Sequence, residues 1–64
     1  MNLLFFKDAD ENIVAVNPEY VTFIETDKYK DKAITMIYFT NYKIAVLNQF
    51  DDVVSALNAW RKRT

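Results

Sequence analysis

The sequence predicts a single α+β domain, in which about five short antiparallel strands form a curled or barrel-like meander with one C-terminal amphipathic helix packed across it. Short runs of β-branched and aromatic residues, separated by polar connections, predict the strands. The last segment instead repeats its apolar residues at helical spacing, and the whole chain of 64 residues (1–64) has the size of one domain.

The first two strands are predicted at 3–6 and 13–16, on either side of a connection (7–12) that is rich in Asp and Asn. Two such strands around a polar connection are typical of a β-hairpin. Because the chain has no glycine, we expect Asp10 or Asn12 to take the left-handed position of the turn.

A proline-containing segment separates this hairpin from the rest of the sheet. Pro18 cannot donate a ladder hydrogen bond, so 17–19 is predicted to form a corner or a brief helical turn. Further strands are predicted at 20–26, 33–40 and 44–47, joined by a charged connection and a turn. In the first of these strands, the side chains that we expect to face the core are Val21, Phe23 and Ile24.

The C-terminal helix has the clearest pattern. Asn48 is the expected N-cap, and the acids at 51–52 and the bases at 61–63 suit the two ends of the helix dipole. One apolar stripe follows the i, i+3, i+4, i+7 spacing and consists of Phe50, Val53, Val54, Leu57 and Trp60. The stripe residues that we expect in the core are Phe50, Val53 and Leu57.

The residue types that are absent exclude most catalytic and cofactor chemistry. The chain has no Cys and no His, which excludes disulfides and the usual zinc sites. Without glycine it cannot form a phosphate-binding loop or a nucleophile elbow. Ser55 is the only serine, it lies within the predicted helix, and no histidine is present to act as its base. We therefore expect no enzymatic activity, no metal and no cofactor.

The charge pattern favours no particular partner by itself. No apolar run approaches the length of about 20 residues that spans a membrane, and the start of the chain lacks the features of a signal peptide, so a cytoplasmic location without membrane insertion is expected. The net charge is −1, with net −5 over 1–27 (one base, six acids) and net +4 over 28–64 (seven bases, three acids). This asymmetry either favours head-to-tail contacts between copies or pairs the two halves of one chain.

Single-stranded nucleic-acid binding by a small β-barrel is the alternative function. Tyr29 lies within a lysine-rich connection, and a second basic cluster follows Trp60. Small barrels hold single strands with stacked aromatic rings and with cations that follow the backbone. The net negative charge and the few arginines make nucleic acid the less expected partner. The candidate contact residues are Lys28, Tyr29, Lys30, Lys32, Lys43, Arg61, Lys62 and Arg63.

Non-catalytic protein–protein interaction is the function that the sequence favours. Hydrophobic residues make up 52% of the chain and aromatic residues 16%, a surplus for so small a core. A strand at 3–6 carries two large apolar side chains on each face. We expect a homo-oligomer, or a small regulator or inhibitor that docks on a larger bacterial or phage–host assembly. The expected interface residues are Leu4, Phe6, Tyr29, Tyr38 and Trp60.

Part of the chain, roughly residues 13–57, resembles a known family. The segments VNPEYVTFIE (16–25), TMIYFTN (35–41), KIAV (43–46) and FDDVV (50–54) are similar to the pattern of the small FlbD-like (SwrD-like) proteins of bacterial flagellar operons. The resemblance implies a meander followed by a short helix, and no catalytic residues. The chain departs from that pattern at Tyr42, where the family has a glycine, and in its basic C-terminal extension.

Overall fold

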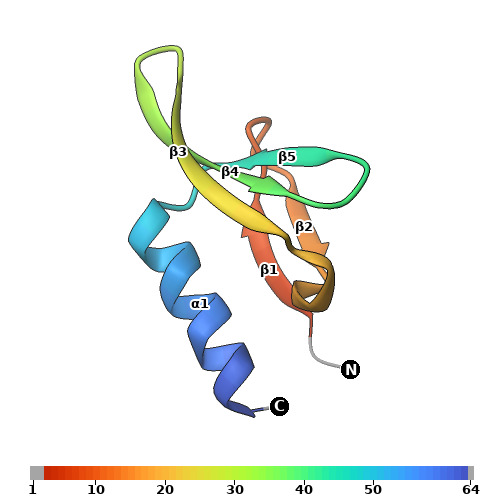
Figure 1. Ribbon diagram of the computed structural model, residues 1–64. Helices are drawn as coiled ribbons and strands as arrows, with labels where there is room; N and C mark the ends of the chain where they lie inside the picture. The colour runs from red at the N-terminus through yellow and green to blue at the C-terminus, as the bar shows by residue number, and fades with distance from the viewer. Residues whose placement is uncertain (1–2, 64) are drawn as a thin grey trace.

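The computed structural model describes residues 3–63 and confirms the α+β class. Short antiparallel strands come first along the chain, and a single helix follows them (Figure 1). In chain order the elements are β1 (Leu4–Lys7), β2 (Ile13–Val16), the 3-10 turn η1 (Pro18–Tyr20), β3 (Phe23–Tyr29), β4 (Lys32–Tyr38), β5 (Lys43–Val46) and α1 (Phe50–Arg63).

The strands form two sheets, a ribbon of β1 and β2 and a sheet in the order β3-β4-β5. The sheets meet at one corner, where Asp8 bridges Val46 and the Leu47 N–H donates to the Lys7 carbonyl over 2.7 Å. Within residues 3–63 the outer strands β2 and β3 do not pair, so the sheets do not close. The curled alternative of the prediction is therefore correct, and the barrel-like one is wrong.

Alternation along the ribbon decides which side chains enter the core. The register pairs Leu4 with Val16 and Phe6 with Val14, and these four side chains share the inner face. Phe6 and Val16 are buried, and the other two are half-buried. Phe5 lies between them on β1 and therefore points to the opposite, solvent-facing side.

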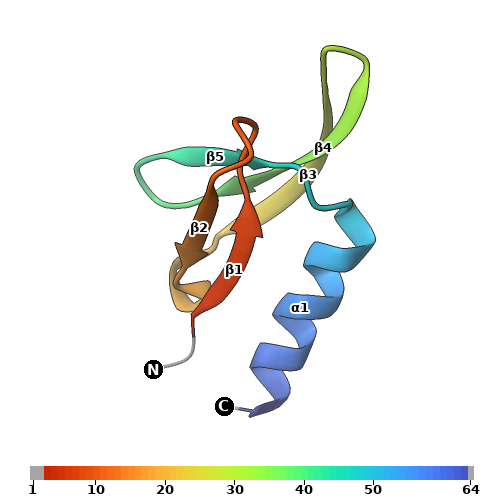
Figure 2. The same cartoon turned by 180° about the vertical axis from the view of Figure 1, so that it is seen from behind.

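The core lies between the ribbon and the three-stranded sheet, and α1 covers one side of it (Figures 1 and 2). Val53 is fully buried and Leu57 packs against the core, as the helical stripe predicts. Phe50, the remaining core residue predicted on α1, is only half-buried. The buried core cluster comprises Phe6, Val16, Ile37, Phe39, Val46 and Val53.

The helix begins without the predicted Asn48 cap. The side-chain oxygen of Asn48 instead accepts from the Lys7 N–H over 3.1 Å, and its backbone carbonyl accepts from the buried Thr35 hydroxyl over 2.8 Å. Helix α1 starts two residues later, at Phe50, where the Val53 N–H donates to the Gln49 carbonyl. Asn48 therefore ties the start of the helix to both sheets, because tertiary partners compete for its polar groups.

The turns and the bounds of β3 also differ from prediction. Glu11, rather than Asp10 or Asn12, takes the left-handed position of the first turn, with φ of 66°. Strand β3 begins later than predicted, since the preceding Pro18–Tyr20 segment is the predicted helical turn. Because Ile24 packs on the core, its neighbour Phe23 faces outward and is 53% exposed, so the prediction of a core Phe23 is wrong.

Candidate protein interface

The outer side of the β1–β2 ribbon is apolar and exposed to solvent. Ile13 is 74% exposed and Phe5 is 65% exposed. They lie on the same side of neighbouring strands as diagonal neighbours, because Phe5 pairs with Ala15 and Ile13 lies two residues before Ala15. Ala15 and Leu3 extend this patch, and Lys7 is the charged residue at its edge. We call the outer surface formed by Leu3, Phe5, Ile13 and Ala15 the ribbon face.

The ribbon face exists because both strands are apolar at nearly every position. β1 reads LFFK and β2 reads IVAV, so alternation places large apolar side chains on both sides. One side fills the core, and nothing within residues 3–63 covers the other side. An antiparallel ribbon with one wet face would ordinarily carry polar residues there.

Two of the predicted interface residues, Leu4 and Phe6, belong to the inner side of the ribbon. Phe6 is 5% exposed and packs in the core, and the half-buried Leu4 packs against the same cluster. A ring already buried within the chain cannot be an anchor for a partner, so the prediction for Phe6 is wrong. Phe5 and Ile13 are the exposed residues that sequence reasoning missed, since it recognised surplus apolar surface but not its side.

Tyr38 lies on the outer side of the three-stranded sheet within a layered stack. Its ring stacks on Phe23 with centroids 4.1 Å apart, and the Lys43 Nζ lies 5.5 Å from the ring centroid. Its hydroxyl donates to Glu25 Oε1 over 2.6 Å. This hydrogen bond, together with desolvation and the charges of Glu25 and Asp27, raises the pKa of Tyr38 above its ordinary value. Tyr38 is thus held by its neighbours, and Phe23 is the more exposed ring.

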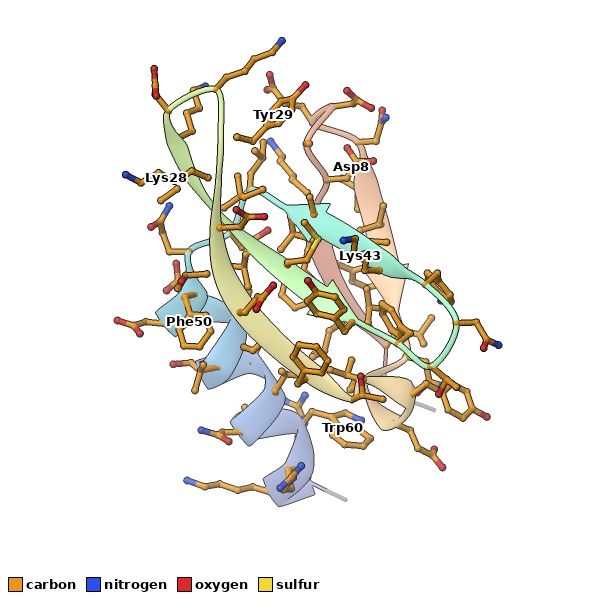
Figure 3. All side chains as sticks on the ribbon, turned by 45° about the horizontal axis from the view of Figure 1, so that its top comes forward. Asp8, Lys28, Tyr29, Lys43, Phe50 and Trp60 are labelled. Atoms are coloured by element: carbon orange, nitrogen blue, oxygen red, sulfur yellow. The ribbon has the colours of Figure 1, made fainter. Side chains whose placement is uncertain are left out.

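Tyr29 and Trp60 lie far from each other, at opposite ends of the molecule (Figure 3). Tyr29 is 48% exposed near the tip of the β3–β4 hairpin, with the Lys30 Nζ 5.3 Å from its ring centroid. Trp60 is half-buried near the end of α1, where it lines a pocket of about 140 Å³ with Phe23 and Leu57. Trp60 is therefore near the stack of Phe23 on Tyr38, whereas Tyr29 is not. The predicted interface residues therefore do not form one continuous surface.

An apolar hollow opens on the side away from α1. It has a volume of about 240 Å³ and lies between β2 and β5, lined by Val14 and Ile44. Tyr20 and Tyr42 also line it and are 64% and 62% exposed, and Tyr42 stacks on Phe39 with centroids 4.6 Å apart. The sequence carries no local signal for this hollow, because residues far apart in the chain form it.

The candidate nucleic-acid residues do not converge on one groove. Lys28, Lys30 and Lys32 lie at the hairpin tip, which is also where Asp27 and Asp31 lie. The basic residues 61–63 end the helix at the opposite end of the molecule (Figure 1). Lys43 lies between these ends on β5, beside the Tyr38 ring (Figure 3). This separation removes the continuous basic track that a single strand would follow.

Comparisons with known proteins give no relative on which to base a function. No protein-family model, no curated protein and no solved structure matches the chain. The FlbD-like resemblance therefore stays a prediction. Among residues 3–63, no helix has the length and hydrophobicity needed to cross a membrane, and no group of acidic side chains is arranged to hold a metal ion.

Proposed function

We propose that this chain is a non-catalytic protein-interaction module whose contact surface is the ribbon face. The observation that carries the proposal is the exposure of Phe5 and Ile13, at 65% and 74%, on a ribbon whose other side already fills the core. Large apolar side chains that are scattered singly over a surface need no explanation. Here they are diagonal neighbours on one two-stranded ribbon, which is an arrangement that a partner can cover.

Covering the ribbon face would release a useful amount of free energy. Complete burial of a Phe or Ile side chain contributes about 1.5–3 kcal/mol. Since about two thirds of each of these two side chains is exposed, a partner that covers both gains about 2–4 kcal/mol. That gain is a hydrophobic centre for an interface, and the polar rim and the remaining contacts must supply the rest.

The composition of the hollow between β2 and β5 supports the non-catalytic part of the proposal. It is lined by aliphatic and aromatic residues with Asn17, and it contains no carboxylate and no amine. Its titratable groups are the hydroxyls of Tyr20 and Tyr42, residues that are 64% and 62% exposed to solvent. Acid–base catalysis near neutral pH requires a titratable group held in such a pocket. The partner is either a second copy of this chain or a larger assembly on which the chain docks as a small regulator.

Site-specific photo-crosslinking in cells that express the chain tests this function. A photoreactive phenylalanine (benzoylphenylalanine) replaces Phe5 in one variant and Phe23 in a second. Phe23 is a matched control because it is also an exposed phenylalanine, 53% exposed, on the outer side of the other sheet. We expect position 5 to give a discrete adduct and position 23 to give none. The absence of any adduct from position 5 would overturn the proposed function.

A further inference from the structure

We propose that the partner at the ribbon face is a second copy of this chain, packed face to face and antiparallel. In this dimer the β1–β2 turn of each copy lies against the C-terminal end of α1 of the other copy. The inference deepens the proposed function and depends on it. It rests on the chemistry of the ribbon face, on the charges at its two ends and on the size of the exposed surface.

The chemistry of the ribbon face is self-complementary. Its centre is apolar, and Lys7 is the one charged side chain on the outer side of β1 and β2. An apolar surface packs well against another apolar surface of similar shape. The ribbon face of a second copy meets this condition. Two sheets that pack face to face lie about 10 Å apart, with their side chains interdigitated. Phe5 and Ile13 then fill the layer between the two ribbons.

Opposite charges flank the ribbon face at its two ends. The turn between β1 and β2 carries the acids Asp8, Asp10 and Glu11 without any base at 8–12. The end of α1 carries the bases at 61–63, without any acid at 53–63. Figure 2 shows the ribbon toward the viewer, with this turn above it and the end of α1 below it. The exposed positions at these ends include Asp10, Glu11, Lys62 and Arg63.

These charges select the antiparallel arrangement. A two-fold axis that lies in the interface and runs across the strands places the acidic turn of one copy near the basic helix end of the other. An axis parallel to the strands would bring acid near acid and base near base. Attraction and repulsion between such patches fix the register of an interface, and both weaken as salt is added.

The apolar part of the ribbon face is too small to hold this dimer by itself, so the charged ends must contribute to the contact. The chain exposes 4780 Å², whereas a compact protein of its mass exposes about 4300 Å². If a large side chain offers about 200 Å², the exposed parts of Leu3, Phe5 and Ile13 supply about 350 Å². A stable interface buries about 800 Å² on each partner. The two charged ends must therefore lie within the contact, as the antiparallel arrangement provides.

The first test measures association by sedimentation equilibrium from low to high micromolar concentration. We expect a reversible dimer whose Kd rises as salt is added. Ile13→Glu should raise the Kd at least tenfold without unfolding the monomer, because Ile13 is 74% exposed. Tyr42→Glu, at a 62% exposed position in the β4–β5 turn, should leave the Kd unchanged. A dimer that tolerates Ile13→Glu would place the contact elsewhere and overturn the inference.

Charge reversal tests the orientation. One variant carries Asp10→Lys with Glu11→Lys, and the other carries Lys62→Glu with Arg63→Glu. Each variant alone should dimerise several-fold more weakly than the parent chain, because both end contacts then join like charges. An equimolar mixture should form a heterodimer, because both contacts then join opposite charges. Variants that dimerise as the parent does, or a mixture that gains nothing, would refute the antiparallel packing.

The photo-crosslinking variant at position 5 separates failure of this inference from failure of the proposed function. An adduct with twice the mass of the chain, together with a concentration-dependent dimer, supports the second copy. An adduct to a different protein from a chain that stays monomeric at every concentration overturns the second copy but retains the interaction module. A strict monomer that gives no adduct overturns both.

Discussion

Phe5 and Phe6 are neighbours in the chain, yet their replacement by alanine should affect folding very differently. Phe6 is 5% exposed and Phe5 is 65% exposed, so the buried fractions of the two side chains differ by 60%. With about 200 Å² for a phenylalanine side chain, Phe6 buries about 120 Å² more than Phe5. At about 25 cal/mol per Å², Phe6→Ala should destabilise the monomer by about 3 kcal/mol more than Phe5→Ala.

Urea unfolding followed by Trp60 fluorescence measures this difference. The measurement should be made at submicromolar concentration, where any dimer is dissociated. A domain of this size is stable by only about 3–10 kcal/mol, so Phe6→Ala will leave little folded protein. Phe6→Leu, which keeps most of the volume and should cost less than about 2 kcal/mol, keeps the measurement readable. The matched comparison is then Phe6→Leu with Phe5→Leu.

The result that refutes the reasoning is equal destabilisation by the changes at positions 5 and 6, or a larger loss at position 5. Either outcome would mean that β1 presents its other side to the core. Because the side-chain period of a strand is two residues, a register shift of one residue exchanges the faces completely. The ribbon face, and with it the proposed function, would then be placed on the wrong side chains.

Further predictions concern the hairpin tip, the buried hydroxyl and the outer stack. Lys30 and Asp31 adopt positive φ angles of 49° and 64° in the two-residue β3–β4 turn. The double change Lys30→Asn with Asp31→Gly should therefore raise the free energy of unfolding by about 1 kcal/mol, measured in urea. Thr35→Val should lower it by about 1–2 kcal/mol, because Thr35 is fully buried and its hydroxyl satisfies a backbone carbonyl. In an NMR titration of the ring carbons, Tyr38 should ionise above the ordinary pKa of tyrosine and should move toward that pKa in Glu25→Ala. The raised pKa means that the hydrogen bond to Glu25 contributes fully below the ordinary tyrosine pKa and is lost as the pH rises through the raised value.

The helix and the strand content could be predicted because their signals are local. In α1, Val53 and Leu57 lie on one stripe, and acidic and basic residues lie at the ends that the dipole favours. The 3-10 turn at Pro18–Tyr20 likewise follows from proline and from Asn17, whose side chain accepts from the Glu19 N–H. Each of these features depends on residues within about one turn of one another, which a linear pattern records.

The sequence predicted that the candidate site is an exposed apolar surface, but it did not predict which residues form that surface. Surplus apolar surface follows from composition, but its position does not, because β1 and β2 are apolar on both sides and alternation then offers two equivalent choices. Asn48 shows the same limit, since its side chain could cap the helix locally but bonds to the Lys7 N–H instead. The wide spacing of the basic clusters also depends on how the hairpin and α1 are placed.

By itself, the sequence determined which segments form strands and which forms the helix, and their order along the chain. It also determined that thiol, imidazole and glycine-loop chemistry is absent, since this follows from residue type alone. The tertiary structure alone decided that Phe6 is buried while Phe5 and Ile13 are exposed, that the sheets stay open, and that opposite charges flank the ribbon face. The physical reason is that both faces of β1 and β2 are apolar, so hydrophobicity alone does not decide which face is buried. The packing of the other sheet and of α1 against the ribbon decides it. That choice depends on contacts between distant segments, which no local pattern encodes.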